Sequence, residues 1–169
     1  MGPPPVAACQ AGQWLEDAPV KDDIRQQIGR LLDQHRIMTV ATLRPDGWPQ
    51  ATTVGYANDG LTLYFLCGLD SQKSVNLARD NRLSLTIDHD TPQVMEITGL
   101  SMAARAVPVT EVAEGEKAMR LLMAKYPEQT SLPFPMPKFA EVRIFRVTPT
   151  VISVLDYSKG FGHTDLITC

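Results

Sequence analysis

Residues 52–82 read TTVGYANDGLTLYFLCGLDSQKSVNLARDNR, and this stretch decides how the rest of the chain is interpreted. Two runs rich in β-branched and aromatic residues flank Asn58-Asp59-Gly60, a combination typical of a β-hairpin turn. Ser71-Gln72-Lys73 then opens a short amphipathic helix. The order predicts a hairpin that ends beside the positively charged start of a helix.

Composition predicts a soluble globular protein. The 169 residues are enough for one domain, and 44% are hydrophobic and 21% charged. The formal net charge of −3 argues against a nucleic-acid-binding face, and no apolar run is long enough to cross a bilayer. Three widely spaced cysteines argue against a disulfide framework. We therefore expect a cytoplasmic protein that binds neither nucleic acid nor membrane.

The chain divides into three parts. Residues 1–19 are rich in Pro, Ala and Gly and predict a flexible N-terminal arm. Residues 20–157 carry the periodic patterns of a folded domain. Residues 158–169 are polar and Gly-rich, and we interpret them as a C-terminal tail. Trp48 is interpreted as a packing residue at the start of a strand.

Strands dominate the expected secondary structure. Three strands with short turns predict a β-meander between residues 37 and 67, and Pro149 is expected to split the closing strand. The total is six or seven antiparallel strands with about three helices, which favours a closed or nearly closed barrel because closure removes exposed strand edges. The expected strands are 37–43, 48–57, 61–67, 82–88, 92–109, 140–147 and 151–155, and the expected helices are 20–35, 71–81 and 111–126.

The strongest chemical signal is the start of the helix at Ser71. Its first turn offers unpaired backbone N–H groups, the Ser71 hydroxyl is a further donor, and Lys73 adds a full positive charge. These groups suit a phosphate dianion. A capped surface helix with a solvated lysine is the alternative, and the residues alone leave both open.

Other motifs carry less chemistry. No zinc-protease, Cys-x-x-Cys, phosphate-loop or nucleophile-elbow spacing is present in the sequence. Asp88-His89-Asp90 has metal-ligand residue types, but we interpret it as a solvated loop between strands. Without an acid–base set, the sequence predicts that a bound cofactor carries out any chemistry.

The chain resembles the flavin-binding split barrels related to pyridoxamine 5′-phosphate oxidase. The resemblance covers residues 37–109 and rests on the Ser-x-Lys helix start, the segment NLARDNRLSL at residues 76–85, Gln93-Val94 and the later Gly99. It implies a mainly β, six-to-seven-stranded antiparallel Greek-key split barrel with about three helices. It also implies a homodimer with FMN at the interface.

The resemblance assigns cofactor-binding residues by position. It implies that the flavin is lined by one strand segment, Thr52, Thr53, Val54 and Tyr56, and that the ring or the ribityl chain lies against the end of the next strand, Leu66 and Cys67. It also implies that the phosphate is bound at the helix start by Ser71, Gln72 and Lys73, and that the cofactor is reached by one glutamine, Gln93.

Two departures argue against the activity of the namesake oxidase. The oxidases carry an arginine at the start of the flavin strand, where this chain has Ala51 and Thr52. They end in an Arg-x-His motif, whereas residues 157–163 here read YSKGFGH. The resemblance therefore favours the general-stress or uncharacterised flavin-reductase branch. The YSKGFGH segment is either a lid over the flavin or a disordered tail.

The leading hypothesis is an FMN-dependent oxidoreductase that passes electrons from a reduced nicotinamide to a small acceptor. One alternative is a non-catalytic flavin- or haem-binding stress or sensor protein, and another is a deazaflavin-dependent reductase. No catalytic residue is assigned, although Tyr56, Tyr157 and His163 are candidate proton donors.

Overall fold

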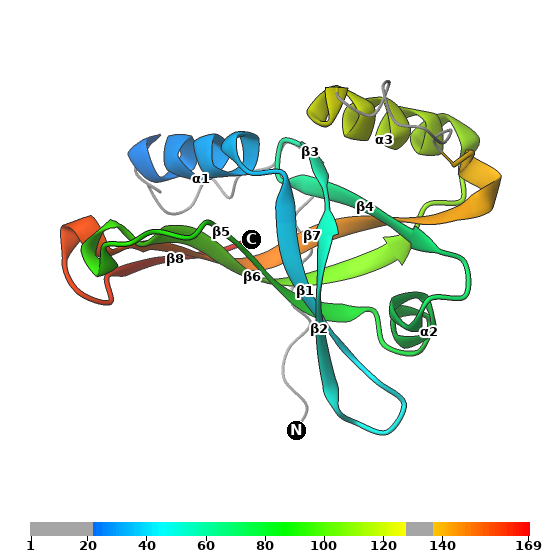
Figure 1. Ribbon diagram of the computed structural model, residues 1–169, viewed down its shortest axis with the longest axis horizontal. Helices are drawn as coiled ribbons and strands as arrows, with labels where there is room; N and C mark the ends of the chain where they lie inside the picture. The colour runs from blue at the N-terminus through cyan, green and yellow to red at the C-terminus, as the bar shows by residue number, and fades with distance from the viewer. Residues whose placement is uncertain (1–21, 128–136) are drawn as a thin grey trace.

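In the part of the chain that the structure describes, an eight-stranded antiparallel sheet curls around the core and carries three α-helices (Figure 1). The structure is a computed structural model that describes residues 22–127 and 137–169. The helices are α1 (Asp22–Gln34), α2 (Gln72–Arg79) and α3 (Val112–Lys125). The strands are β1 (Ile37–Leu43), β2 (Pro49–Gly55), β3 (Ala57–Asp59), β4 (Thr62–Gly68), β5 (Arg82–Asp88), β6 (Thr98–Pro108), β7 (Val142–Asp156) and β8 (Thr164–Thr168). Short 3-10 turns are η1 (Val94–Glu96), η3 (Phe139–Glu141) and η4 (Tyr157–Lys159).

The strand order is β2-β1-β5-β6-β7-β4-β3, with β8 paired to β7. The two longest strands, β6 and β7, lie at the centre, and the sheet curls into a half-barrel (Figure 1). The expectation of a mainly β, antiparallel split barrel with about three helices is confirmed.

The core follows the alternation of the strands. Leu83, Leu85 and Ile87 of β5 are buried, whereas the residues between them are exposed. Because successive side chains of a strand point to opposite sides, this pattern gives the sheet an apolar inner side. Helix α1 places Ile28 and Leu32 in the same core. Complete burial of such a side chain stabilises the fold by about 1.5–3 kcal/mol.

The expected three-stranded meander is wrong. Strand β3 pairs with β4, but β4 pairs on its other side with β7 and not with β2. Tyr56 separates β2 from β3, is completely buried, and donates its backbone N–H to the carbonyl oxygen of Arg36. The chain therefore turns inward at Tyr56, and β2 ends at Gly55. The residue types at positions 56 and 57 favour a strand that continues to Ala57.

Pro149 does not split the closing strand. Strand β7 is continuous over 15 residues, and the register of its pairing with β6 shifts between Ala103 and Ala104, next to Pro149. A bulge of this kind accommodates a residue that has no N–H for the sheet. The strand expected at residues 92–109 begins only at Thr98, after the η1 turn.

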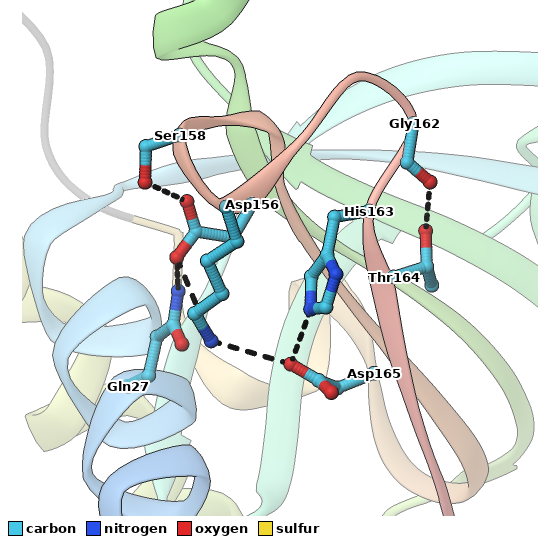
Figure 2. Close-up of polar contacts among 8 residues, drawn as sticks. Gln27, Asp156, Ser158, Gly162, His163, Thr164 and Asp165 are labelled. Carbon is cyan, nitrogen blue, oxygen red and sulfur yellow. Dashed lines mark hydrogen bonds and ion pairs between the residues drawn. The ribbon is translucent and has the colours of Figure 1, made fainter.

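The predicted C-terminal tail forms η4 and β8 and so belongs to the sheet. A polar cluster joins its start to α1 (Figure 2). Gln27 donates to Asp156 at 3.0 Å, Ser158 donates to Asp156 at 2.6 Å, and His163 lies 3.1 Å from Asp165. The arm expected at residues 1–19 lies outside the described residues.

Candidate functional site

The first turn of α2 concentrates hydrogen-bond donors. Ser71 is the N-cap, and its Oγ accepts a hydrogen bond from the backbone N–H of Ser74 at 3.3 Å. The earlier N–H groups of a helix have no acceptor within the helix. Lys73 is half-buried and makes no ion pair with any residue that the structure describes. This end of α2 is therefore electropositive and has donors to offer an anion.

Helix α2 runs along the β1–β2 hairpin. Near its end, Arg79 donates to two backbone carbonyl oxygens of the hairpin turn, at 2.6 and 3.4 Å. One turn earlier, Asn76 donates to Thr42 and Gln50, which face each other across the hairpin. Thr52 is the next residue of β2 on the same side as Gln50. The first turn of α2 lies beyond Asn76, further from the hairpin turn, so the helix start extends along the hairpin in the direction of Thr52.

Thr52 has an unsatisfied hydroxyl. Its Oγ1 is buried, and no partner for it exists among the described residues. An unpaired buried polar atom costs about 1–3 kcal/mol, so such atoms usually have a partner. Val54 points to the same side and joins the core, whereas Thr53 points to the opposite side and is exposed. Strand β2 therefore divides the predicted flavin-lining residues between its two sides.

Three other predicted residues pack in or against the core clusters of the protein. Tyr56 is completely buried, and its hydroxyl donates to the carbonyl oxygen of Leu32 at 2.8 Å. Burial also raises the pKa of Tyr56 far above its usual value, so this phenol is a poor proton donor to a substrate. Cys67 belongs to the main core, and Leu66 packs against the second core cluster beneath α3.

Gln93 lies far from α2 within one chain. Strand β5 starts at Arg82, shortly after α2, and its seven residues span roughly 20 Å before Asp88. Gln93 follows that far end, is exposed, and precedes η1. Figure 1 shows the β5–β6 connection and α2 at opposite ends of the molecule. The predicted phosphate-binding residues and Gln93 therefore form two groups in one chain, one at the first turn of α2 and one beyond the far end of β5.

Tyr157 and His163 belong to the group around Gln93. Tyr157 donates its backbone N–H to the carbonyl oxygen of Ile97, next to η1, and its ring contacts Phe161 with 5.6 Å between ring centres. His163 and Lys159 both contact the carboxylate of Asp165. The hydrogen bond from His163 is the main cause that lowers the pKa of Asp165.

A family model described as pyridoxamine 5′-phosphate oxidase matches residues 24–156. The chain belongs to this family. The match includes α2, the β1–β2 hairpin and Gln93, and it confirms the resemblance on which the site residues were assigned. A search of curated proteins found no significant match to the chain.

Solved structures share the fold of this family. A heme binding protein from Mycobacterium smegmatis aligns with a TM-score of 0.70 and 17% identity, over 88% of this chain and 59% of that one. A putative pyridoxamine 5′-phosphate oxidase from Listeria innocua aligns with a TM-score of 0.65 and 20% identity, over 79% and 98%. An FAD-binding protein from Mesorhizobium loti aligns with a TM-score of 0.61 and 16% identity, over 76% and 91%. At these identities the alignments establish the fold.

Sequence reasoning missed the amide network beneath α2. Asn76 is completely buried and bonded to Thr42, Gln50 and Gln72. The available signal was Asn76 next to Leu77, on the apolar side of a short helix where an aliphatic residue is the usual choice. Trp48, expected to pack, is instead 69% exposed beside the β1–β2 turn.

No metal centre is evident in the described residues. They contain no group of three or more His, Cys, Asp or Glu side chains placed to hold an ion. Asp88 ends β5, His89 and Asp90 follow it, and all three are exposed and line a cavity of about 240 Å³. The His89 ring stacks on His35 with 5.3 Å between ring centres. Within the same residues, no helix is long and apolar enough to span a bilayer.

Proposed function

We propose that the chain is a flavoprotein that binds FMN, with the phosphate at the first turn of α2. The observation that carries the proposal is the Ser71 N-cap beside Lys73, which has no ion-pair partner among the described residues, on a helix that is bonded to β2 at Gln50, two residues before the unsatisfied Thr52 hydroxyl. A phosphate dianion is stabilised by several donors and a helix start. Membership of the pyridoxamine 5′-phosphate oxidase family supports this choice of ligand.

The donor set fits the phosphate even though the arginine of the namesake oxidases is absent. Lys73 supplies a charge, the N–H groups of Gln72 and Lys73 supply directional donors, and Thr52 replaces a cation with a hydroxyl. FMN, when bound, supplies the chemistry of hydride and electron transfer. The residues of this chain bind the phosphate and orient the flavin.

The proposal includes a homodimer, supported by the side of the sheet that faces away from the core. This side is here called the outer face. At its centre, two rows of residues lie opposite one another on five adjacent strands and are small and uncharged. One row is Thr53, Thr39, Thr86, Ser101 and Ser153, and the next is Ala51, Ala41, Ser84, Ala103 and Val151. Depletion of charge is typical of the centre of a protein interface.

Charges at the ends of the outer face suit a two-fold dimer. Arg82 and Arg105 lie at one end of β5 and β6, and Asp88 lies at the other end of β5. A two-fold axis between Ser84 and Thr86 would bring Arg82 of one copy to Asp88 of the second. The same rotation would carry Gln93 of the second copy toward α2 of the first. Two copies together would then place Gln93 of one copy at the same end of the sheet as α2 of the other.

The proposed activity is that of an FMN-dependent oxidoreductase, which takes electrons from a reduced nicotinamide and passes them to a small acceptor. A non-catalytic haem- or flavin-binding role is the second candidate, because the Mycobacterium smegmatis relative is described as a heme binding protein. A deazaflavin in place of FMN is the third candidate. Absorbance and mass of the small molecule that co-purifies separate the three.

The test of the phosphate site uses paired lysine variants. Lys73→Met should raise the Kd for FMN at least about tenfold, because it removes a charge-assisted contact. Lys117→Met is the matched control, since Lys117 lies on α3 and pairs with Asp59. Unchanged FMN affinity in Lys73→Met would reject this phosphate site. Anaerobic bleaching of the bound flavin by reduced nicotinamide, followed by reoxidation, tests the activity.

A further inference from the structure

Asn76 is an unusual residue for its place in α2. Its side chain has no exposed surface, and the helix has only eight residues. Asparagine is a weak helix former, and its amide is costly to bury unless it is hydrogen-bonded. Leu77, the next residue, is also buried in the core and is aliphatic, which is the residue type that packing alone favours at such a position. The buried amide therefore requires a reason other than hydrophobic packing.

The contacts of Asn76 link three elements. Its Nδ2 donates to Thr42 Oγ1 of β1 at 2.9 Å and to Gln50 Oε1 of β2 at 3.3 Å. Its Oδ1 accepts from Gln72 Nε2 at 2.8 Å, within the first turn of α2. Three of the four hydrogen-bonding positions of the amide are used. A nearly saturated buried amide fixes one arrangement of its partners, because any other leaves polar atoms unpaired.

We propose that Asn76 is a positioning residue that holds the first turn of α2 in register with the hairpin, so that Ser71, Lys73 and Thr52 face one anion. This inference rests on the proposed FMN site and names the residue that orients it. Thr52 follows Gln50 on the same side of β2, so the contact to Gln50 sets where the helix start lies relative to the Thr52 hydroxyl. Displacement of donors by about 1 Å is enough to weaken such a site.

A purely structural role for Asn76 predicts a different result, and a matched variant separates the two. Asn76→Leu keeps the size of the side chain and removes its three hydrogen bonds. Leu77→Val removes a methylene group from the core in the same helix and leaves the amide network intact. Both variants are expected to lower Tm, and both are measured well below their Tm.

The experiment is FMN titration of the apoprotein, with flavin fluorescence and visible circular dichroism as readouts. Asn76→Leu should raise the Kd for FMN about tenfold and change the dichroism of the bound flavin, while Leu77→Val keeps the wild-type values. Hydrogen exchange of the ligand-free protein should be faster at the amides of Ser74 and Val75, which both donate to Ser71, in Asn76→Leu only. An unchanged Kd in Asn76→Leu, or an equal rise in both variants, would overturn the inference.

Failure of the proposed function has a separate signature. If the wild-type protein binds FMN and Lys73→Met binds it equally well, the phosphate site is wrong, whatever the two α2 variants do. If the wild-type protein binds no FMN, the proposed function fails, and the hydrogen-exchange comparison decides the inference. Equal exchange at the amides of Ser74 and Val75 in Asn76→Leu and the wild type would then reject a positioning role.

Discussion

Arg82 and Arg105 face each other directly across β5 and β6. Like charges in this relationship are destabilising, and each guanidinium has a local partner: Arg82 pairs with Asp80 at 2.6 Å, and Arg105 donates to Asn81 at 3.0 Å. The pair forms one charged end of the outer face, and Asp88 forms the other. This geometry leads to a test of the proposed dimer.

Charge reversal should break the dimer, and a second reversal should restore it. Arg82→Glu places a carboxylate opposite Asp88 of the second copy, and we expect the dimer Kd to rise at least about tenfold. Arg82→Glu combined with Asp88→Arg swaps both ends and should recover the wild-type mass in sedimentation velocity. A single variant that stays dimeric at all protein concentrations tested would contradict the two-fold arrangement.

Tyr56→Phe should affect stability and leave flavin binding unchanged. The substitution removes the hydrogen bond to the carbonyl oxygen of Leu32, which still accepts from Lys125 at 2.6 Å. Because that carbonyl keeps a donor, we expect a loss of only about 1 kcal/mol in the free energy of unfolding. Urea denaturation measures it. Weaker FMN binding or an altered pH–rate profile in this variant would give the phenol a role that its burial argues against.

Lys125 should make stability depend on pH in the alkaline range. Burial lowers its pKa from 10.5 to about 8. Between these values the unfolded chain binds more protons than the folded one, so this group makes the free energy of unfolding rise with pH. Lys125→Met removes this contribution. The free energy of unfolding of the wild type should therefore increase relative to that of the variant as the pH rises through this range. Denaturation in urea at several pH values tests it, and a difference that does not vary with pH would contradict it.

The parts of the fold that follow from local pattern were predictable. Leu83, Leu85 and Ile87 alternate with polar residues and form one side of a strand as expected. The break at Tyr56 was not predictable, because Val54 and Tyr56 continue the same alternation into the turn. Contacts of Tyr56 with α1 and with the start of β1, distant in sequence, decide where the strand ends.

The candidate site was predictable to the same extent. The Ser71 N-cap and the position of Lys73 in the first turn of α2 were identifiable because a helix cap is a local feature. The distance of Gln93 from α2 depends on the length of β5 and on the pairing of β6, so no local pattern contains it. The Asn76 network joins residues 26 and 34 positions apart and becomes visible only when the helix is placed on the hairpin.

Gly115 of α3 offers a test of packing against helix propensity. Alanine is better than glycine in a helix interior by about 1 kcal/mol, so propensity alone predicts that Gly115→Ala is stabilising. A Cβ at this position, however, would lie 2.5 Å from the Phe139 ring. We expect packing to dominate and the variant to lose roughly 1–3 kcal/mol in the free energy of unfolding. Gly29→Ala in α1 is the control, because nothing lies within 4 Å of its Cβ, and it should gain up to about 1 kcal/mol. Phe139→Leu combined with Gly115→Ala should recover part of the loss, and a stabilising Gly115→Ala would show that η3 moves aside without cost.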